Sequence, residues 1–322
     1  MMIPKLSIIV PIYRVENTIE RCVNSLFKQN YDNIEYIFVN DATNDKSVEI
    51  LEQIIAKNPH KKAICKIIHH SENKGLSAAR YSGLLNSTGD YIWHIDSDDA
   101  IDPDAVAGIM HIIEKENSDI VLFNACEVWT NEKRLIKNYL PSSIDEETIL
   151  TLTRQKRFEL CFRVIKRNLY TGLEMDQTLS MGEDWATTPR LSAKAKIISY
   201  FDKICYYYYR DPKSITGNLG EKGINSLLAC YRVLHTFFFK TKYVAYLPVA
   251  KAYLKIHMLK MARNSKENYI YISNSIFSHI SCPSKYMSFP NRVILLLGNL
   301  HLNSISRGYV NLSCNLIKLF QR

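Results

Sequence analysis

The sequence predicts an α/β protein: a mostly parallel β-sheet between helices, followed by a C-terminal region that is mainly helical. Short β-branched apolar runs recur along residues 6–125, and each of the first four is followed by a segment with apolar residues at helical spacing. Such repeated β-α units build a parallel sheet with helices on both faces. The composition changes after Gly220, where acidic residues almost vanish, so we expect domains at residues 1–219 and 220–322.

Each element of the first domain is expected from a local pattern. Apolar runs of the buried-strand type predict five strands, at residues 6–13, 34–42, 63–70, 90–96 and 118–125. Helical spacing of apolar residues predicts the helices that follow the first four strands, at residues 16–30, 46–57, 75–87 and 102–116. Asp102 is the expected N-cap of the last of these helices, with Pro103 as its first residue.

The later elements are less regular. The pattern weakens from Val128 to Leu179, which indicates an excursion from the sheet. Residues 182–195 then predict a loop that leads into a helix, and residues 196–210 predict paired strands. Helical periodicity from Ile224 to Arg263 favours a mainly helical C-terminal domain.

Eight cysteines are scattered along the chain without any CxxC pair, which predicts free thiols in a reducing cytoplasm and not a disulfide or zinc framework. The apolar run at the N-terminus is too short for a secretion signal and is broken by Pro11. No stretch reaches about 18 uncharged apolar residues, the length of a membrane span. We therefore expect a cytoplasmic protein.

The net charge of +9 is unevenly distributed along the chain. From Gly223 to the end there are eight Lys, five Arg and one acid, Glu267, giving 13 − 1 = +12, so residues 1–222 carry 9 − 12 = −3. A basic region rich in aromatic residues suits single-stranded nucleic acid or an anionic membrane surface. No RNA-binding motif is present, so we expect no nucleic acid. A helical bundle whose cations are merely solvated is the alternative.

An acidic cluster, "HIDSDDAIDPDA" at residues 94–105, follows the fourth predicted strand. Ligands of such sheets bind beyond the carboxyl ends of the strands, where Asp41 and Asp96 are expected to lie. A calcium loop would need an acid or Asn, Gly and Glu where this chain has Ala100, Ile101 and Ala107. The cluster therefore favours Mn²⁺ or Mg²⁺, held by one or two carboxylates and completed by a nucleotide diphosphate and water, over a purely structural role.

Five segments resemble, in order, the inverting glycosyltransferases of family 2, which have the GT-A nucleotide-diphospho-sugar fold. The resemblance covers roughly residues 5 to 215. The segments are the opening unit at residues 7–45, "NKGLSAARYSGL" from Asn73, the DXD element "IDSDD", "GEDW" from Gly182, and "YYYYRDPKSIT". The chain departs from the family at residues 40–43, where "NDAT" replaces the usual Asp-Asp-Gly-Ser turn, and at Tyr81, which replaces an Asn.

The resemblance implies a metal-dependent, inverting transfer of a sugar from a nucleotide diphosphate, with UDP favoured, to a hydroxyl group. The acceptor would be a saccharide, or a saccharide on a polyprenyl-diphosphate lipid, in cell-surface polysaccharide synthesis. It favours a peripheral position at the inner face of the cytoplasmic membrane, with the basic C-terminal region on the anionic surface. Asp41 would contact the base, Asp98 and Asp99 would hold the cation, and Asp184 would be the catalytic base.

The other site residues have alternatives. Asp96 is expected to orient ribose or water. Pro11 and Tyr13 would flank the nucleobase, although Tyr13 could simply pack in the core. Arg80 would contact phosphate or, as we favour, brace the acids. Arg210 would clamp phosphate unless it is a solvated strand-end residue.

Two neighbours of Asp184 are assigned to the acceptor side. Trp185 would stack on the acceptor sugar or be a half-buried aromatic. Glu183 and Asp184 could be no more than acids that favour a helix start. If they do begin a helix, their side chains should diverge by about 100° and should not both face the sugar.

Rival functions are judged by what the sequence lacks. A sugar nucleotidyltransferase would need a Gly-rich phosphate loop near the first strand, where "PIYRVENT" has no Gly. An NAD-binding protein would need GxGxxG, which is absent. The altered "NDAT" turn keeps one alternative open, a non-catalytic sugar- or lipid-binding scaffold on the same fold.

Overall fold

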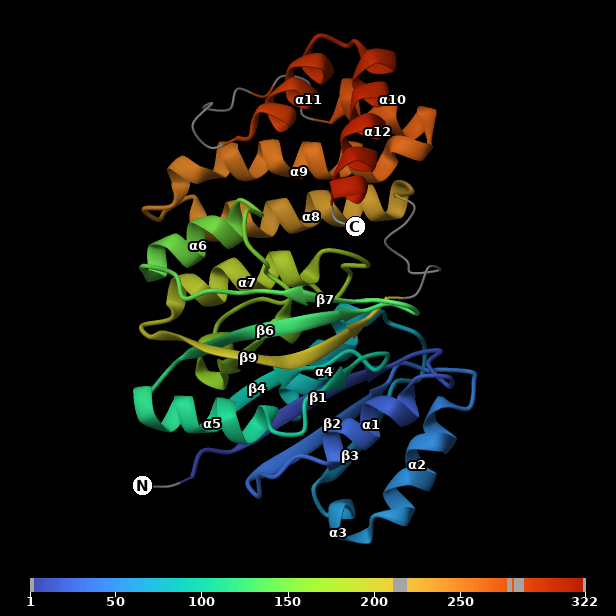
Figure 1. The fold of residues 1–322 in the computed structure, drawn as a ribbon, viewed down its shortest axis with the longest axis vertical. Helices are drawn as coiled ribbons and strands as arrows, with labels where there is room; N and C mark the ends of the chain where they lie inside the picture. The colour runs from blue at the N-terminus through green and yellow to red at the C-terminus, as the bar shows by residue number, and fades with distance from the viewer. Residues whose placement is uncertain (1–2, 211–218, 277–279, 281–286, 321–322) are drawn as a thin grey trace. The chain divides into compact units, whose positions relative to one another are not determined.

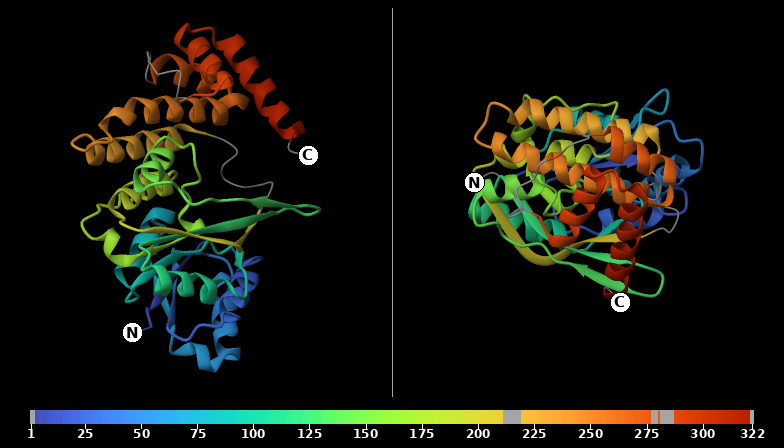
Figure 2. Two further views of the ribbon diagram at one scale, coloured as in Figure 1. Left: turned by 60° about the vertical axis from the view of Figure 1, so that its left-hand side comes forward. Right: turned by 90° about the horizontal axis from the view of Figure 1, so that it is seen from above.

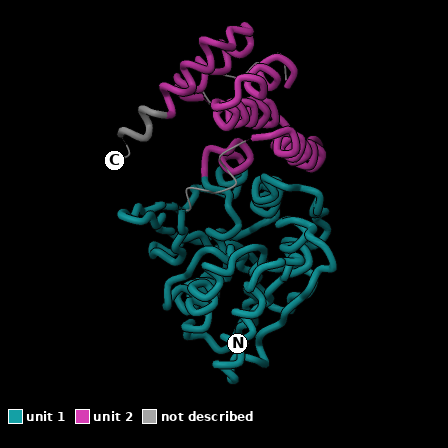
Figure 3. Tube along the Cα trace, turned by 90° about the vertical axis from the view of Figure 1, so that its right-hand side faces the viewer, with its two compact units in different colours: residues 1–148, 157–211 teal, residues 149–156, 212–322 magenta. Residues whose placement is uncertain are grey.

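The computed structural model describes residues 3–210, 219–276, 280 and 287–320, with side chains as far as Cys314 (Figure 1). The chain divides into two compact units (Figure 3). Unit 1 comprises residues 1–148 and 157–211, and unit 2 comprises residues 149–156 and 212–322. The boundary expected near Leu219 adjoins residues 211–218. That segment, with Lys213, Ser214 and Thr216 of the last motif, lies outside the described residues.

The described part of unit 1 contains a nine-stranded mixed sheet. Its first four strands are parallel neighbours, in the order β3 (Cys65–His69), β2 (Ile34–Asn40), β1 (Leu6–Ile12) and β4 (Tyr91–His94). The sheet continues from β4 through β8 (Arg163–Lys166), β6 (Ile120–Val128), β9 (Ile198–Tyr209) and β5 (Ala100–Ile101), and β7 (Lys133–Ile136) pairs with β6.

Helices cover both faces of this sheet because successive strand residues point to opposite sides. Ile8 and Val10 of β1 pack in one core with α1 (Ile19–Phe27), α2 (Ser47–Lys57) and α5 (Ala105–Glu116). Ile9, between them, packs in the other core with α4 (Leu76–Leu85) and α7 (Glu183–Lys194). The remaining helices of this region are short or peripheral: α3 (Pro59–Lys62), η1 (Leu160–Phe162), η2 (Arg167–Tyr170) and α6 (Ile144–Leu152).

The predicted α/β fold class, a mostly parallel sheet between helices, is confirmed. The sheet is mixed, because β8 lies between β4 and β6 and is antiparallel to both. Two local predictions differ from the structure. Residues 198–209 form one strand, β9, whose register with β6 shifts around Asn124, and not a pair of strands. Helix α5 begins at Ala105 with Asp104 as N-cap, two residues later than predicted. Asp102 still accepts hydrogen bonds from the Asp104 amide and the Tyr207 hydroxyl just before the helix.

Gly83 sets how closely α4 approaches the sheet. A Cβ atom at this position would lie 2.3 Å from Cγ2 of Ile9 on β1. Ile9 is fully buried and β-branched, so its side chain has little freedom to move aside. Any larger residue at position 83 would therefore push α4 away from β1.

Unit 2 is helical in its described part, as the helical periodicity predicts (Figure 2). The helical region expected at residues 224–263 is two helices, because a turn and the short η4 (Val244–Tyr246) interrupt it. The main helices are α8 (Glu221–Phe238), α9 (Leu247–Met261), α10 (Lys266–Ser275), α11 (Phe289–Asn299) and α12 (Asn303–Phe320), with η5 (Ala262–Asn264) after α9. Among the described residues, no helix combines the length and the apolar character needed to cross a membrane.

Candidate functional site

Three parallel strands end at the same edge of the sheet, as the predicted β-α units require. Tyr13 follows β1, Asp41 follows β2, and Asp96 lies two residues beyond the end of β4. Tyr13 is 39% exposed, and the Arg14 guanidinium lies 5.1 Å from the centre of its ring. Pro11 is buried within β1. The exposed Tyr13 ring is thus available at the strand end, and its predicted contact with a base stays a prediction.

Asp41 is almost fully buried and organises the loop that leads into α4. Its carboxylate accepts hydrogen bonds from the amides of Lys74 and Gly75, both at 2.8 Å, and contacts Nδ1 of His70 at 2.7 Å. The side-chain amide of Asn73 also donates to the Asp41 carbonyl, at 3.3 Å. The structure therefore gives Asp41 a clear role in holding residues 73–75, while its predicted contact with the base stays a prediction.

The acidic turn after β4 presents its three aspartates differently. Asp98 is exposed, Asp96 is partly exposed, and Asp99 is fully buried. Asp99 accepts a hydrogen bond from the Tyr206 hydroxyl at 2.6 Å and one from the Tyr209 amide at 2.8 Å. Burial raises the pKa of Asp99 well above its usual value, and the charges of Asp98 and Asp96 add to this effect. These two bonds fix the turn against β9, and the predicted role of Asp99 as a metal ligand stays a prediction.

The carboxylates with access to solvent fit a cation whose other ligands are substrate phosphates and water. In the part of the chain that the structure describes, no three or more His, Cys, Asp or Glu side chains form a ready-made metal centre. Asp96 and Asp98 do offer two carboxylates on one turn with access to solvent. Mg²⁺ and similar hard cations commonly bind through one or two carboxylates, with substrate phosphates and water completing the shell.

Arg80 of α4 joins the acidic turn to the start of α7. Its Nη2 lies 2.7 Å from Asp96, and its Nη1 lies 2.7 Å from Glu183 and 2.6 Å from Asp184. Only 1% of Arg80 is exposed. Burial lowers the pKa of Arg80, but the charges of Asp184, Asp96 and Glu183 outweigh it, so the guanidinium stays charged. Arg80 therefore braces the acids, as we favoured from the sequence.

Glu183 and Asp184 both face Arg80, contrary to the expected divergence of adjacent helical side chains. They are the first two residues of α7, and their carboxylates converge on a single guanidinium nitrogen. Burial raises the pKa of Asp184, the charges of Glu183 and Asp96 raise it further, and Arg80 opposes them, leaving a pKa of about 8. A carboxylate with such a pKa can exchange a proton near neutral pH.

Two further predicted residues lie in other surroundings. Arg210, at the end of β9, binds Glu127 of β6 through Nη2 at 2.5 Å, and its guanidinium lies 4.4 Å from the centre of the Tyr208 ring. Its predicted contact with phosphate would require it to leave Glu127. Trp185 is fully buried, so the expected stacking on an acceptor sugar does not fit this structure.

The sequence did not indicate Arg21, Tyr206 or Tyr209 as site residues. Arg21 of α1 donates from Nη2 to the Asp98 carbonyl, and its guanidinium lies 3.6 Å from the centre of the Tyr209 ring. Tyr206 reaches Asp99 across 107 positions of the chain. No local pattern predicts contacts between elements this far apart in the sequence.

The comparisons with known proteins agree with this architecture. Residues 7–169 match the family model for glycosyl transferase family 2. The uncharacterized glycosyltransferase EpsJ of Bacillus subtilis is 31% identical over 67% of this chain and 64% of its own length. Glycosyltransferase GlyA of Streptococcus pneumoniae is 30% identical over 70% of this chain and 33% of its own length. The aligned part of the chain therefore spans less than two thirds of either relative.

Solved structures share the fold at low sequence identity. S. aureus TarS 1-349 in complex with UDP-GlcNAc has a TM-score of 0.70 at 18% identity, over 95% of this chain and 90% of that one. The mannosyltransferase PcManGT of Pyrobaculum calidifontis, in complex with GDP-Man and Mn²⁺, has a TM-score of 0.56 at 15% identity, over 97% and 88% of the two chains. These likenesses establish the GT-A type of α/β fold. Because the family match covers half of the chain and includes the strands, α4 and the acidic turn that build the site, this protein belongs to glycosyl transferase family 2.

Proposed function

We propose that this protein is an inverting glycosyltransferase that moves a sugar from a nucleotide diphosphate to a hydroxyl group of a saccharide or lipid-linked saccharide in cell-surface polysaccharide synthesis. One observation carries the proposal. Arg80 holds Asp96, on the predicted donor side, and Asp184, the predicted base, through the same buried guanidinium. An inverting transfer needs a base on one side of the anomeric carbon and charge stabilisation of the leaving group on the other, and Arg80 links the carboxylates proposed for these two sides.

The chemistry assigns a task to each side. The acceptor hydroxyl attacks the anomeric carbon from the side opposite the departing diphosphate. Asp184 takes the proton of that hydroxyl, and a positioned carboxylate base contributes about 10²–10⁴-fold to such a step. Arg80 fixes the direction of the Asp184 carboxylate, and its charge opposes protonation of that group in the resting enzyme.

The donor side would hold Mn²⁺ or Mg²⁺ through Asp98, with Asp96 beside it. When bound, the cation neutralises the charge that develops on the leaving diphosphate. The protein itself keeps the turn in place: Asp99 is tied to Tyr206 and Tyr209, and the Asp98 carbonyl is held by Arg21. UDP is the favoured nucleotide, with support from the UDP-GlcNAc complex of TarS, although PcManGT was solved with GDP-Man.

The location is proposed from the positive charge of the C-terminal region, and the acceptor follows from that location. The +12 of residues 223–322 suits the anionic inner face of the cytoplasmic membrane, where each Lys or Arg near the surface contributes about 1 kcal/mol. A protein held there would meet acceptors carried on polyprenyl-diphosphate lipids. The minor teichoic acid biosynthesis protein GgaB of Bacillus subtilis, 26% identical over 63% of this chain and 22% of its own length, offers further support for a cell-surface product.

Nucleotide binding is the first test. We expect one of UDP, GDP and dTDP to bind tightly in the presence of Mn²⁺ and weakly without it, as measured by calorimetry on the full chain. Asp98→Asn should lose the dependence on the metal, whereas Asp104→Asn, a change at the nearby N-cap of α5, should keep it. Failure of all three nucleotides to bind with metal would favour the non-catalytic scaffold.

Turnover separates an enzyme from a scaffold. With a donor identified, Asp184→Asn should lower kcat by about 10²–10⁴-fold while leaving the nucleotide affinity close to that of the native protein. The variant keeps the size of the side chain, so Arg80 and Glu183 can stay in place. Full turnover by Asp184→Asn would disprove Asp184 as the base.

A further inference from the structure

The turn between α11 and α12 carries large apolar side chains on its outer surface. Leu296 and Leu300 are each 57% exposed, Leu302 is 42% exposed, and Ile305 is 61% exposed. All four lie within ten positions, around the residues that join the two helices. We propose that this turn inserts into the surface of an anionic lipid membrane, so that the protein is held by apolar insertion as well as by charge. The inference rests on the membrane contact in the proposed function and is independent of the catalytic roles.

The exposed residues stand on a well-formed turn. The amide of His301 donates to the Gly298 carbonyl at 3.1 Å, and that of Leu302 to the Leu297 carbonyl at 3.0 Å. His301 adopts a left-handed conformation, with φ of 57°, which reverses the chain between the helices. The backbone therefore holds Leu300 and Leu302 outward at a fixed position.

The helices beside the turn already bury a separate apolar face. Ile294, Leu295 and Gly298 of α11 point inward, so Leu296 and Leu300 are not the core face of this helix. At the start of α12 a polar residue is buried and an apolar one is exposed. Ser306 is fully buried against the Tyr269 hydroxyl, while its neighbour Ile305 is exposed. Four large exposed apolar residues within ten positions, unlike scattered single ones, indicate an interaction surface.

Charge decides which partner fits. Residues 268–322 contain five Lys or Arg and no Asp or Glu, and Arg292, exposed on α11, lies one turn before Leu296. Two copies of so basic a region would repel each other, whereas an anionic membrane attracts the cations and accepts the leucines below its headgroups. A turn with basic flanks and an apolar tip thus matches the anionic headgroups of a membrane and the apolar acyl chains below them.

Vesicle binding of the full-length protein tests the insertion. Leu300→Ser, Leu302→Ser and Ile305→Ser are combined in one variant, and Leu135→Ser, at a leucine of β7 that is 52% exposed, is the matched control. We expect the triple variant to bind phosphatidylcholine vesicles containing phosphatidylglycerol at least about tenfold more weakly than the native protein, and the control to bind equally well. In high salt, the native protein should keep a residual affinity that the triple variant lacks.

Fluorescence quenching tests directly whether the turn between α11 and α12 reaches the acyl chains of the membrane. In Leu302→Trp, the introduced indole should be quenched by lipids brominated on their acyl chains, and in Leu135→Trp it should not. No added quenching in Leu302→Trp, or unchanged vesicle binding by the triple variant, overturns the proposal. If the triple variant instead converts a dimer into a monomer by light scattering with vesicle binding intact, the turn is an interface between copies.

Metal-dependent nucleotide binding, measured on the same variants, separates this inference from the proposed function. These residues are remote in sequence from the site, so native nucleotide affinity with lost insertion supports both proposals. Native nucleotide affinity with unchanged vesicle binding overturns only the insertion.

Discussion

Ala42 occupies a backbone conformation that favours glycine. Its φ is 53°, at the position where the family turn usually has Gly, and the turn is held by the Thr43 amide bonded to the Asn40 side chain at 2.9 Å. Left-handed backbone is strained for a residue with a Cβ atom. Ala42 thus adopts this conformation without the glycine that usually stands there in the family.

Ala42→Gly should therefore stabilise the protein. Relief of the strain outweighs the extra freedom that glycine has in the unfolded chain, and we expect a gain of about 0.5–1 kcal/mol in the free energy of unfolding. Urea denaturation measures it as a higher midpoint with an unchanged slope. An equal or lower midpoint would contradict the prediction.

The raised pKa of Asp184 predicts how the rate depends on pH. Only the ionised carboxylate can take a proton from the acceptor, and burial beside Glu183 and Asp96 raises the pKa of Asp184 to about 8. The value of kcat/KM should therefore rise about tenfold per pH unit below that pKa and level off above it. A rate that is flat with pH in this range would show that another group is the base.

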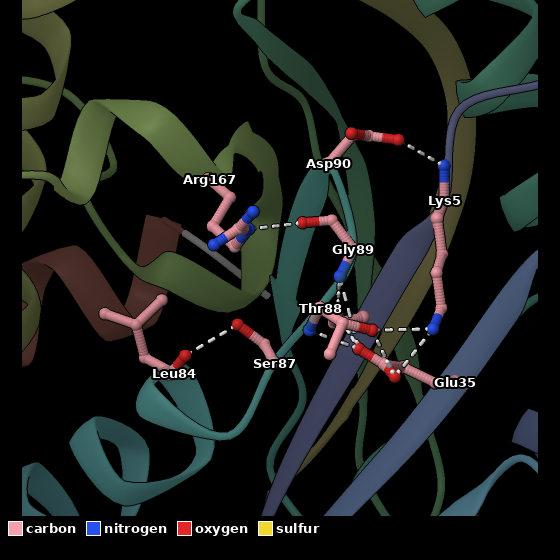
Figure 4. A network of polar contacts seen from close by, with 9 residues as sticks. Lys5, Glu35, Leu84, Ser87, Thr88, Gly89, Asp90 and Arg167 are labelled. Carbon is pink, nitrogen blue, oxygen red and sulfur yellow. Dashed lines mark hydrogen bonds and ion pairs between the residues drawn. The ribbon is translucent and has the colours of Figure 1, made fainter. Parts of the chain in front are cut away.

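At the scale of elements, a polar network ties together the strand ends opposite the site (Figure 4). Glu35 of β2 accepts hydrogen bonds from Lys5 at 2.8 Å, from the Thr88 amide at 2.7 Å and from Ser7 of β1. Gly89 fits here because a Cβ atom would lie 2.7 Å from the Ser7 amide nitrogen, and its carbonyl accepts a hydrogen bond from Arg167 at 2.6 Å. The network fixes β1, β2 and the loop before β4 in register.

Glu35→Gln should lower stability in a pH-dependent way. Burial raises the pKa of Glu35, but hydrogen bonds from Lys5, Ser7 and Thr88 outweigh it and lower the pKa to about 2. A depressed pKa stabilises the fold above the usual carboxyl pKa, and this contribution is lost as the pH falls toward 2. We expect a loss of about 1–3 kcal/mol at neutral pH that shrinks in acid.

Denaturation of Glu35→Gln at several pH values provides the measurement. Glu52→Gln, on the exposed face of α2, is the matched control and should change stability little. A loss that stays constant between neutral and acid pH would show that the Glu35 charge is not the cause.

Local patterns predict most elements of unit 1 but not how they pair. The five apolar runs did become β1, β2, β3, β4 and β6. All except the edge strand β3 are largely buried, which requires apolar residues on both faces. Strand β8 was missed because charged Arg163 and Lys166 bound it. Arg163 is nevertheless fully buried, paired with Glu147 of α6 at 3.1 Å, and no short window of sequence contains both partners.

The same limit applies to the site. The sequence places Asp96, Asp98 and Asp184 beside strand or helix ends, and the structure brings Asp96 and Asp184 to one arginine. It could not indicate that Asp99 turns inward, since the tyrosine that binds it belongs to a strand 107 positions later. Burial of a carboxylate is decided by such distant partners and not by its neighbours in the chain.

At the scale of the whole molecule, the charge asymmetry predicts that membrane binding depends on salt. The Debye length falls from about 10 Å at 0.1 M to about 3 Å at 1 M ionic strength, which screens most of the attraction. Lys240→Glu with Lys266→Glu, both exposed in unit 2, should lower binding to anionic vesicles at least about tenfold. Sedimentation with vesicles measures it.

Lys57→Glu with Lys62→Glu, both exposed in unit 1, makes the same change in net charge and serves as the control. We expect this pair to bind vesicles almost as the native protein does. Equal losses in the two double variants would mean that total charge, and not the basic C-terminal region, governs binding.

Gly83 has a consequence for which substitutions this protein can tolerate. It lies one turn after Arg80 on α4, and even alanine there would collide with Ile9. The helix would shift outward and carry the guanidinium away from its three carboxylates. In a saturation mutagenesis screen, substitutions at position 83 should therefore inactivate the protein as strongly as substitutions of the acidic residues. Such variants would be taken for catalytic ones, although glycine has no side chain to take part in the reaction.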